Sequence, residues 1–102
     1  MGYEYATNRI RNLCDTLSCI DDAEEVNSFL IDLCTPAELR ALSERWQMAR
    51  LLDSGGLSYR GIRAVTGVST TTIGRVARFL KDESYQGYRR VLDHLKTHTT
   101  GH

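Results

Sequence analysis

Two short helix-forming stretches joined by a tight turn constrain the fold more than any other feature of the sequence. Ser58 can cap a helix of about Tyr59–Thr66, and Gly67 can adopt the left-handed conformation that ends it. Ser69 can cap a second helix of about Thr70–Lys81. This spacing predicts a helix-turn-helix. The apolar residues that would lock its two helices together are Ile62, Val68, Ile73 and Val76.

The remaining sequence is also patterned for helices, without sustained alternation of apolar and polar residues. A capping box at Thr35–Glu38, with Pro36 at the first helical position, predicts a helix that ends at Gly55 and Gly56. The other helix-forming stretches are about Tyr5–Ser18, Asp22–Leu33 and Tyr85–Leu95. The buried face of the second of these is predicted to consist of Val26, Phe29, Leu30 and Leu33. We therefore expect an all-α fold with six helices and a frayed polar tail.

The length of the chain limits it to one short domain, and its sequence pattern argues against a membrane, secreted or metal-binding protein. A chain of 102 residues suits one short domain that would gain stability from a partner chain. No apolar run approaches the roughly 18 residues that would span a membrane, and no signal pattern precedes the first helix, so we expect a cytoplasmic protein. His94, His98 and His102 recur every four residues, but the threonines around them are poor helix formers. We therefore expect no metal site and no cofactor.

Charge is distributed unevenly along the chain. The 13 basic and 13 acidic residues give a formal net charge of zero. Residues 1–39 nevertheless hold eight acidic and two basic side chains, whereas residues 57–81 hold five basic side chains and no acidic one. The basic segment at residues 57–81 favours an anionic partner.

The second helix of the helix-turn-helix has the chemistry of a DNA-contacting helix. Arginine can bind guanine through two hydrogen bonds, and threonine can contact a base or the thymine methyl group. Groove depth favours base contacts by the first turns, where the free N–H groups after Ser69 also suit a phosphate. The expected base-contacting residues are Thr70, Thr71, Thr72 and Arg75, with Arg78 further along the same face. Arg60 and Arg63 on the first helix are expected to contact the sugar-phosphate backbone.

Two other classes of function compete with DNA binding. In a protein-interaction module, the acidic first half would dock a basic partner and the helix-turn-helix would be a scaffold. Enzyme activity is the weaker alternative, because the sequence lacks a Ser/His/Asp grouping, a phosphate-cradling loop and a carboxylate pair beside a base.

Several stretches resemble the Trp-repressor superfamily and are most similar to its YerC/YecD-type subgroup. They are Leu33–Leu39, Ser58–Ile62 and Thr66–Val76. The resemblance covers about residues 22–95 and implies an intertwined, all-α homodimer. Such a dimer would place two helix-turn-helix units on successive major grooves of a near-palindromic operator. The implied function is sequence-specific regulation of transcription, most simply repression.

The resemblance also implies a division of labour along the single domain. Dimerisation helices would lie in residues 1–56 and 82–95, on either side of the helix-turn-helix at residues 57–81. Residues 96–102 would form a flexible tail.

The resemblance also raises the question of whether this protein binds tryptophan. In the Trp repressor, the ligand lies between two arginines beside a capping threonine, and the matching positions here are Arg45, Arg75 and Thr35. Val76 and Phe79 stand where the repressor has a glycine and a small serine, and Phe79 cannot accept a hydrogen bond from an ammonium group. We therefore expect that Phe79 fills the site and that no tryptophan is needed. The alternative is control by an unidentified small ligand near the two arginines.

Overall fold

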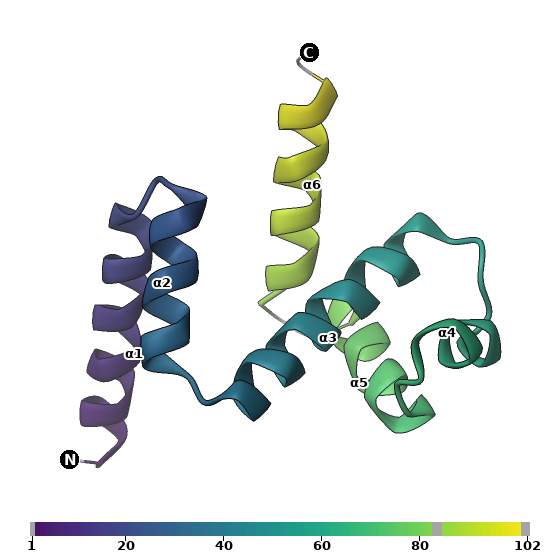
Figure 1. Cartoon of the computed structure of the whole chain (residues 1–102), viewed down its shortest axis with the longest axis horizontal. Helices are drawn as coiled ribbons and strands as arrows, with labels where there is room; N and C mark the ends of the chain where they lie inside the picture. The colour runs from purple at the N-terminus through teal and green to yellow at the C-terminus, as the bar shows by residue number, and fades with distance from the viewer. Residues whose placement is uncertain (1, 83–84, 101–102) are drawn as a thin grey trace. The chain divides into compact units, whose positions relative to one another are not determined.

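The structure, a computed structural model, describes residues 2–82 and 85–100 and contains six α-helices and no strand in that part of the chain (Figure 1). The prediction of an all-α fold with six helices is therefore confirmed. The helices are α1 (Gly2–Cys19), α2 (Ala23–Leu33), α3 (Pro36–Ser54), α4 (Tyr59–Thr66), α5 (Thr70–Lys81) and α6 (Gly87–Thr100). The side chain of His98 and all of His102 lie outside the described residues. No described helix has the length and apolarity needed to cross a membrane.

The chain divides into two compact units, one ending at Leu39 and the other beginning at Arg40. The first unit contains α1, α2 and the first turn of α3. The second contains the rest of α3 together with α4, α5 and α6. All the basic residues of the helix-turn-helix lie within the second unit.

The apolar faces of the first unit are only partly covered. The Asp22 carboxylate accepts a hydrogen bond from the Glu25 backbone N–H at 3.1 Å and so caps α2. However, α2 has no buried residue, and Leu33 is 50% exposed, so the prediction of a buried face on this helix is wrong for the single chain. On α1, Ile10 is 64% exposed. Two helices packed only on each other provide too little surface to enclose both apolar stripes.

The predicted capping box at the start of α3 is confirmed. The Thr35 backbone N–H donates to Glu38 Oε1 at 2.8 Å, and the Glu38 N–H donates to Thr35 Oγ1 at 3.1 Å. Hydrogen bonds to the Glu38 carboxyl, first from the Thr35 backbone N–H and then from the Thr35 side chain, favour its ionised form and lower the pKa of Glu38. At the other end, Gly55 has a φ of 70°, which stops the helix after Ser54 as predicted.

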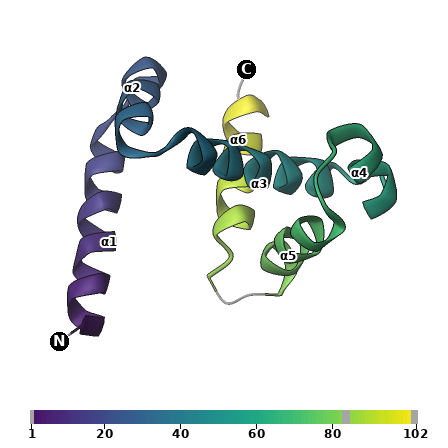
Figure 2. The ribbon, with the colours of Figure 1, turned by 60° about the horizontal axis from the view of Figure 1, so that its bottom comes forward.

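The core of the second unit contains the four apolar residues that were predicted to hold α4 and α5 together. Ile62, Val68, Ile73 and Val76 are all buried, with exposed fractions of 8% or less. They pack with Met48 and Ala49 of α3, Leu80 of α5 and Leu92 of α6 in one core. Figures 1 and 2 show α4 and α5 lying side by side as a result. The helix-turn-helix is thus joined through its core to both α3 and α6.

The last helix, α6, begins and ends later than predicted. Gln86 has a φ of 53°, outside the helical region, so the helix starts after it. At the other end, the Thr97 hydroxyl donates to a backbone carbonyl one turn earlier at 3.0 Å. Lys96 also pairs with Asp53 of α3 at 2.8 Å. These contacts offset the low helix propensity of the threonines, so α6 extends past its predicted end at Leu95.

Candidate nucleic-acid interface

Local hydrogen bonds hold the turn between α4 and α5. Gly67 has a φ of 77°, and its N–H donates to the Arg63 carbonyl at 2.8 Å, which ends α4. Thr66 adds two hydrogen bonds that the sequence pattern does not reveal: its hydroxyl donates to the Ile62 carbonyl at 2.7 Å and accepts from the Val68 N–H at 3.2 Å. The turn is therefore fixed by side-chain and backbone contacts on both sides of the glycine.

Serine caps begin both helices of the motif as predicted. Ser58 Oγ accepts from the Gly61 N–H at 3.0 Å, and Ser69 Oγ accepts from the Thr72 N–H at 3.2 Å. The Ser69 hydroxyl also donates to Thr72 Oγ1 at 3.1 Å. The hydroxyls of Ser69 and Thr72 are therefore both engaged in the cap.

The expected DNA-contacting side chains are accessible to solvent. Thr72 is half-buried, and the others are exposed: Arg60, Arg63, Ser69, Thr70, Thr71, Arg75 and Arg78. None of the described residues combines a charged side chain with full burial. The helix-turn-helix therefore has an apolar core and presents its guanidinium groups at its surface.

Phe79 lies beneath two of these arginines. The Arg75 guanidinium carbon is 4.5 Å from the centre of the Phe79 ring, and that of Arg78 is 5.3 Å from it. Both distances are within the range of cation–π attraction. The ring therefore contacts both guanidinium groups and restricts the movement of these two side chains on α5.

A hollow of about 280 Å³ lies beside this ring and brings four of the five predicted ligand-pocket residues together. It is lined by Leu42, Arg45, Trp46, Arg75, Val76, Phe79 and Tyr88. We call it the arginine hollow. The fifth residue, Thr35, belongs to the first unit, where it forms the capping box of α3.

A larger hollow of about 610 Å³ is almost entirely aromatic and apolar. It is lined by Trp46, Phe79, Tyr85, Gln86, Gly87, Tyr88 and Val91. Inside the second unit, the rings of Trp46 on α3 and Tyr88 on α6 are stacked, with centroids 6.5 Å apart and planes at 20°. We call this the aromatic hollow. Tyr85 on its rim is 86% exposed, so much apolar surface faces solvent in the single chain.

Comparison with known proteins identifies this arrangement. The family model described as Trp repressor protein matches residues 8–96, which is most of the chain. The chain belongs to the Trp repressor family. The Bacillus subtilis protein YerC, which is described as uncharacterised, is 38% identical over 84 residues, covering 82% of this chain and 79% of its own.

Two solved structures described as Trp repressor-like have the same fold. A candidate Trp repressor from Staphylococcus aureus superposes with a TM-score of 0.78 at 34% identity, covering 87% of each chain. A TrpR-like protein from Eubacterium eligens gives a TM-score of 0.79 at 34% identity, covering 87% of this chain and 90% of its own. The helix order described above is therefore that of a Trp repressor-like protein.

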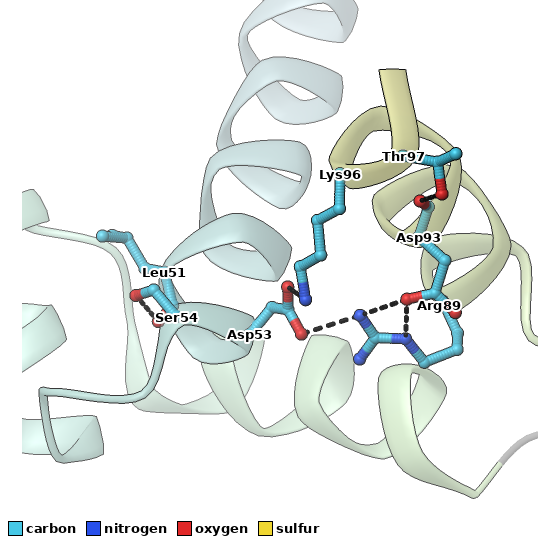
Figure 3. Close-up of polar contacts among 7 residues, drawn as sticks. All are labelled: Leu51, Asp53, Ser54, Arg89, Asp93, Lys96 and Thr97. Carbon is cyan, nitrogen blue, oxygen red and sulfur yellow. Dashed lines mark hydrogen bonds and ion pairs between the residues drawn. The ribbon is translucent and has the colours of Figure 1, made fainter. Parts of the chain in front are cut away.

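An ion-pair cluster joins α3 to α6 in this member of the Trp repressor family (Figure 3). It consists of Asp53, Arg89, Asp93 and Lys96, and we call it the α3–α6 cluster. Asp53 Oδ1 lies 2.8 Å from Arg89 Nη2, and Asp53 Oδ2 lies 2.8 Å from Lys96 Nζ. Hydrogen bonds from Lys96 and Arg89 lower the pKa of Asp53. The sequence pattern did not single out these residues.

Proposed function

We propose that this protein is a sequence-specific DNA-binding regulator of transcription, most simply a repressor that occludes its operator. The observation that carries the proposal is the helix-turn-helix itself, whose exposed arginines and threonines lie in a segment of 25 residues without an acidic side chain. Membership of the Trp repressor family supports the same function and argues against an enzyme. Lys and Arg contacts would supply affinity, and α5 would supply base discrimination.

The active form would be a homodimer. The apolar stripes of α1 and α2 and the rim of the aromatic hollow expose large side chains, including Ile10, Leu33 and Tyr85, that a second chain could cover. A twofold dimer presents the same surface twice and would display two helix-turn-helix units. We infer that residues 1–56 and 82–95 supply the dimer contacts, and that residues 57–81 contact a near-palindromic operator.

Selection of bound fragments from random DNA tests this function. We expect enrichment of two inverted half-sites whose centres lie about 10 base pairs apart, or one helical turn, because each unit must meet a major groove on the same side of the duplex. A variant with Arg60, Arg63 and Arg75 replaced by alanine is the control and should enrich nothing. Failure of the wild-type protein to enrich any sequence would contradict the proposal.

We also propose that DNA binding does not need tryptophan. The Phe79 ring already lies against the Arg75 guanidinium, so an aromatic group of the chain itself takes the place of an aromatic ligand beside this arginine. Calorimetry with L-tryptophan should therefore detect no binding at micromolar concentrations. Addition of 1 mM tryptophan, roughly a thousandfold above a micromolar dissociation constant, should leave operator affinity unchanged. Micromolar binding of tryptophan would refute this interpretation.

Control by a different small ligand is the second candidate, and the open arginine hollow favours it. Arg45 and Arg75 both line this space together with aromatic residues, an environment suited to a small anion with an apolar body. A thermal-shift screen of aromatic carboxylates would reveal such a ligand as a rise in Tm that Arg45→Ala abolishes.

The third candidate function is a protein-interaction module. It predicts no mobility shift on random DNA at low salt.

A further inference from the structure

The α3–α6 cluster joins the two ends of the helix-turn-helix segment. Asp53 is the second-to-last residue of α3, and Arg89 is the third residue of α6. The chain enters the segment that carries α4 and α5 just after Asp53 and leaves it just before Arg89. A contact of 2.8 Å between the side chains of Asp53 and Arg89 therefore connects the two ends of this segment (Figure 3).

Asp53 contacts α6 through both carboxylate oxygens, one with Arg89 and the other with Lys96. Its side chain is only 11% exposed. The same Arg89 Nη2 also lies 3.0 Å from Asp93 Oδ1, and the Arg89 Nε–H donates to that oxygen at 3.1 Å. Contacts with two carboxylates leave the guanidinium little freedom to turn. Asp93 belongs to α6 itself, so Asp53 makes the connection to α3.

A second contact between the same two helices adjoins Arg89 on α6 but lies about two helical turns from the Asp53–Lys96 pair on both helices. The Trp46 ring of α3 stacks on the Tyr88 ring of α6, two helical turns before Asp53 along α3. One contact between two helices allows them to pivot, whereas two separated contacts fix the angle between them. Removal of the Asp53 contacts would leave the aromatic stack and the core packing of Leu92 to orient α6, without an ion pair at the end of α3.

We propose that Asp53 is a positioning residue that fixes the orientation of the helix-turn-helix and, through it, the half-site spacing that the dimer accepts. This inference rests on the proposed function. The core of α4 and α5 packs on Met48 and Ala49 of α3 and on Leu92 of α6, so a change in the α3–α6 angle moves α5. Successive base pairs are about 3.4 Å apart, and a shift of that size at each α5 changes the preferred spacing.

The test compares operators whose half-sites are moved apart or together by one base pair. The wild-type protein should prefer its selected spacing by about tenfold or more, and Asp53→Asn should reduce this preference to about threefold or less. Base preference within each half-site should stay unchanged in Asp53→Asn, because α5 keeps its side chains. The conservative variant Asp53→Glu should restore part of the spacing preference.

Asp93→Asn is the matched control. It removes a neighbour of the same Arg89 but leaves both contacts of Asp53 with α6, so it should keep the wild-type spacing preference. Thermal melting establishes that each variant is folded. If Asp53→Asn is unfolded, Lys96→Gln takes its place, because the Lys96 side chain is 59% exposed and its loss removes only one contact.

Each outcome bears on a different proposal. Folded Asp53→Asn, or Lys96→Gln in its place, with wild-type spacing preference would overturn the inference while the proposed function stands. An equal effect of Asp93→Asn would overturn it as well. If the wild-type protein selects no sequence at all, the proposed function fails, and the positioning role fails with it.

Discussion

Replacement of Arg75 by alanine should erase the preference of this protein for its operator over random DNA. A bidentate contact between arginine and guanine contributes about 1–3 kcal/mol of discrimination, and each 1.4 kcal/mol is about tenfold in affinity. The Phe79 ring holds the Arg75 guanidinium 4.5 Å from its centre, so less side-chain freedom remains to be lost when the contact forms. Competition binding with labelled operator and unlabelled random DNA measures the preference.

Arg78→Ala is the matched control for Arg75→Ala. Both arginines project from α5 over the same Phe79 ring, but Arg78 lies one turn further from the start of the helix. It should contact phosphate rather than bases, so its loss should weaken operator and random DNA alike. An equal loss on both DNAs from Arg75→Ala would contradict the assignment of Arg75 to base contacts.

The helix-turn-helix could be predicted from the sequence because its determinants are local. Ser58 and Ser69 bond backbone N–H groups three residues further on, and Gly67 supplies the left-handed turn, so three residues mark where both helices begin and where the first ends. The lock residues follow from helical periodicity, and they are buried. Short-range rules therefore gave the limits of α4 and α5 without error.

Contacts between distant residues could not be predicted in the same way. Asp53 and Arg89 are 36 positions apart, and nothing in one sequence indicates which carboxylate a given arginine will meet. The face of α2 was predicted to be buried because its apolar residues recur at helical spacing, but periodicity shows only that a face is apolar. It does not show whether the same chain or a partner covers that face.

The stacking of Arg75 on Phe79 was partly predictable from the sequence, unlike the contacts between distant residues. The two residues are four positions apart on α5, and side chains at this spacing are neighbours on a helix. The sequence therefore contained a signal for the contact. The sequence interpretation placed both residues in the possible ligand pocket and gave Arg75 a base contact as well, but it did not predict that the Phe79 ring lies against the Arg75 guanidinium.

The second large expected effect is a steep loss of affinity with salt. Arg60, Arg63 and Arg78 from both protomers would make six phosphate contacts, which predicts a slope of about −5 for log affinity against log salt concentration. A rise from about 50 to 200 mM salt should therefore weaken binding by about a thousandfold. The measurement is operator affinity at several salt concentrations, by fluorescence anisotropy.

Arg60→Ala should make this slope shallower by about 2, because it removes one phosphate contact from each protomer. Arg50→Ala is the control, since Arg50 is also exposed but lies on α3, outside the helix-turn-helix. It should lower the net charge equally and leave the slope unchanged. The comparison separates direct phosphate contact from overall charge, which matters in a chain whose basic segment is balanced by eight acidic residues in positions 1–39. If the two variants changed the slope equally, overall charge would explain the salt effect and the assignment of Arg60 to phosphate would fail.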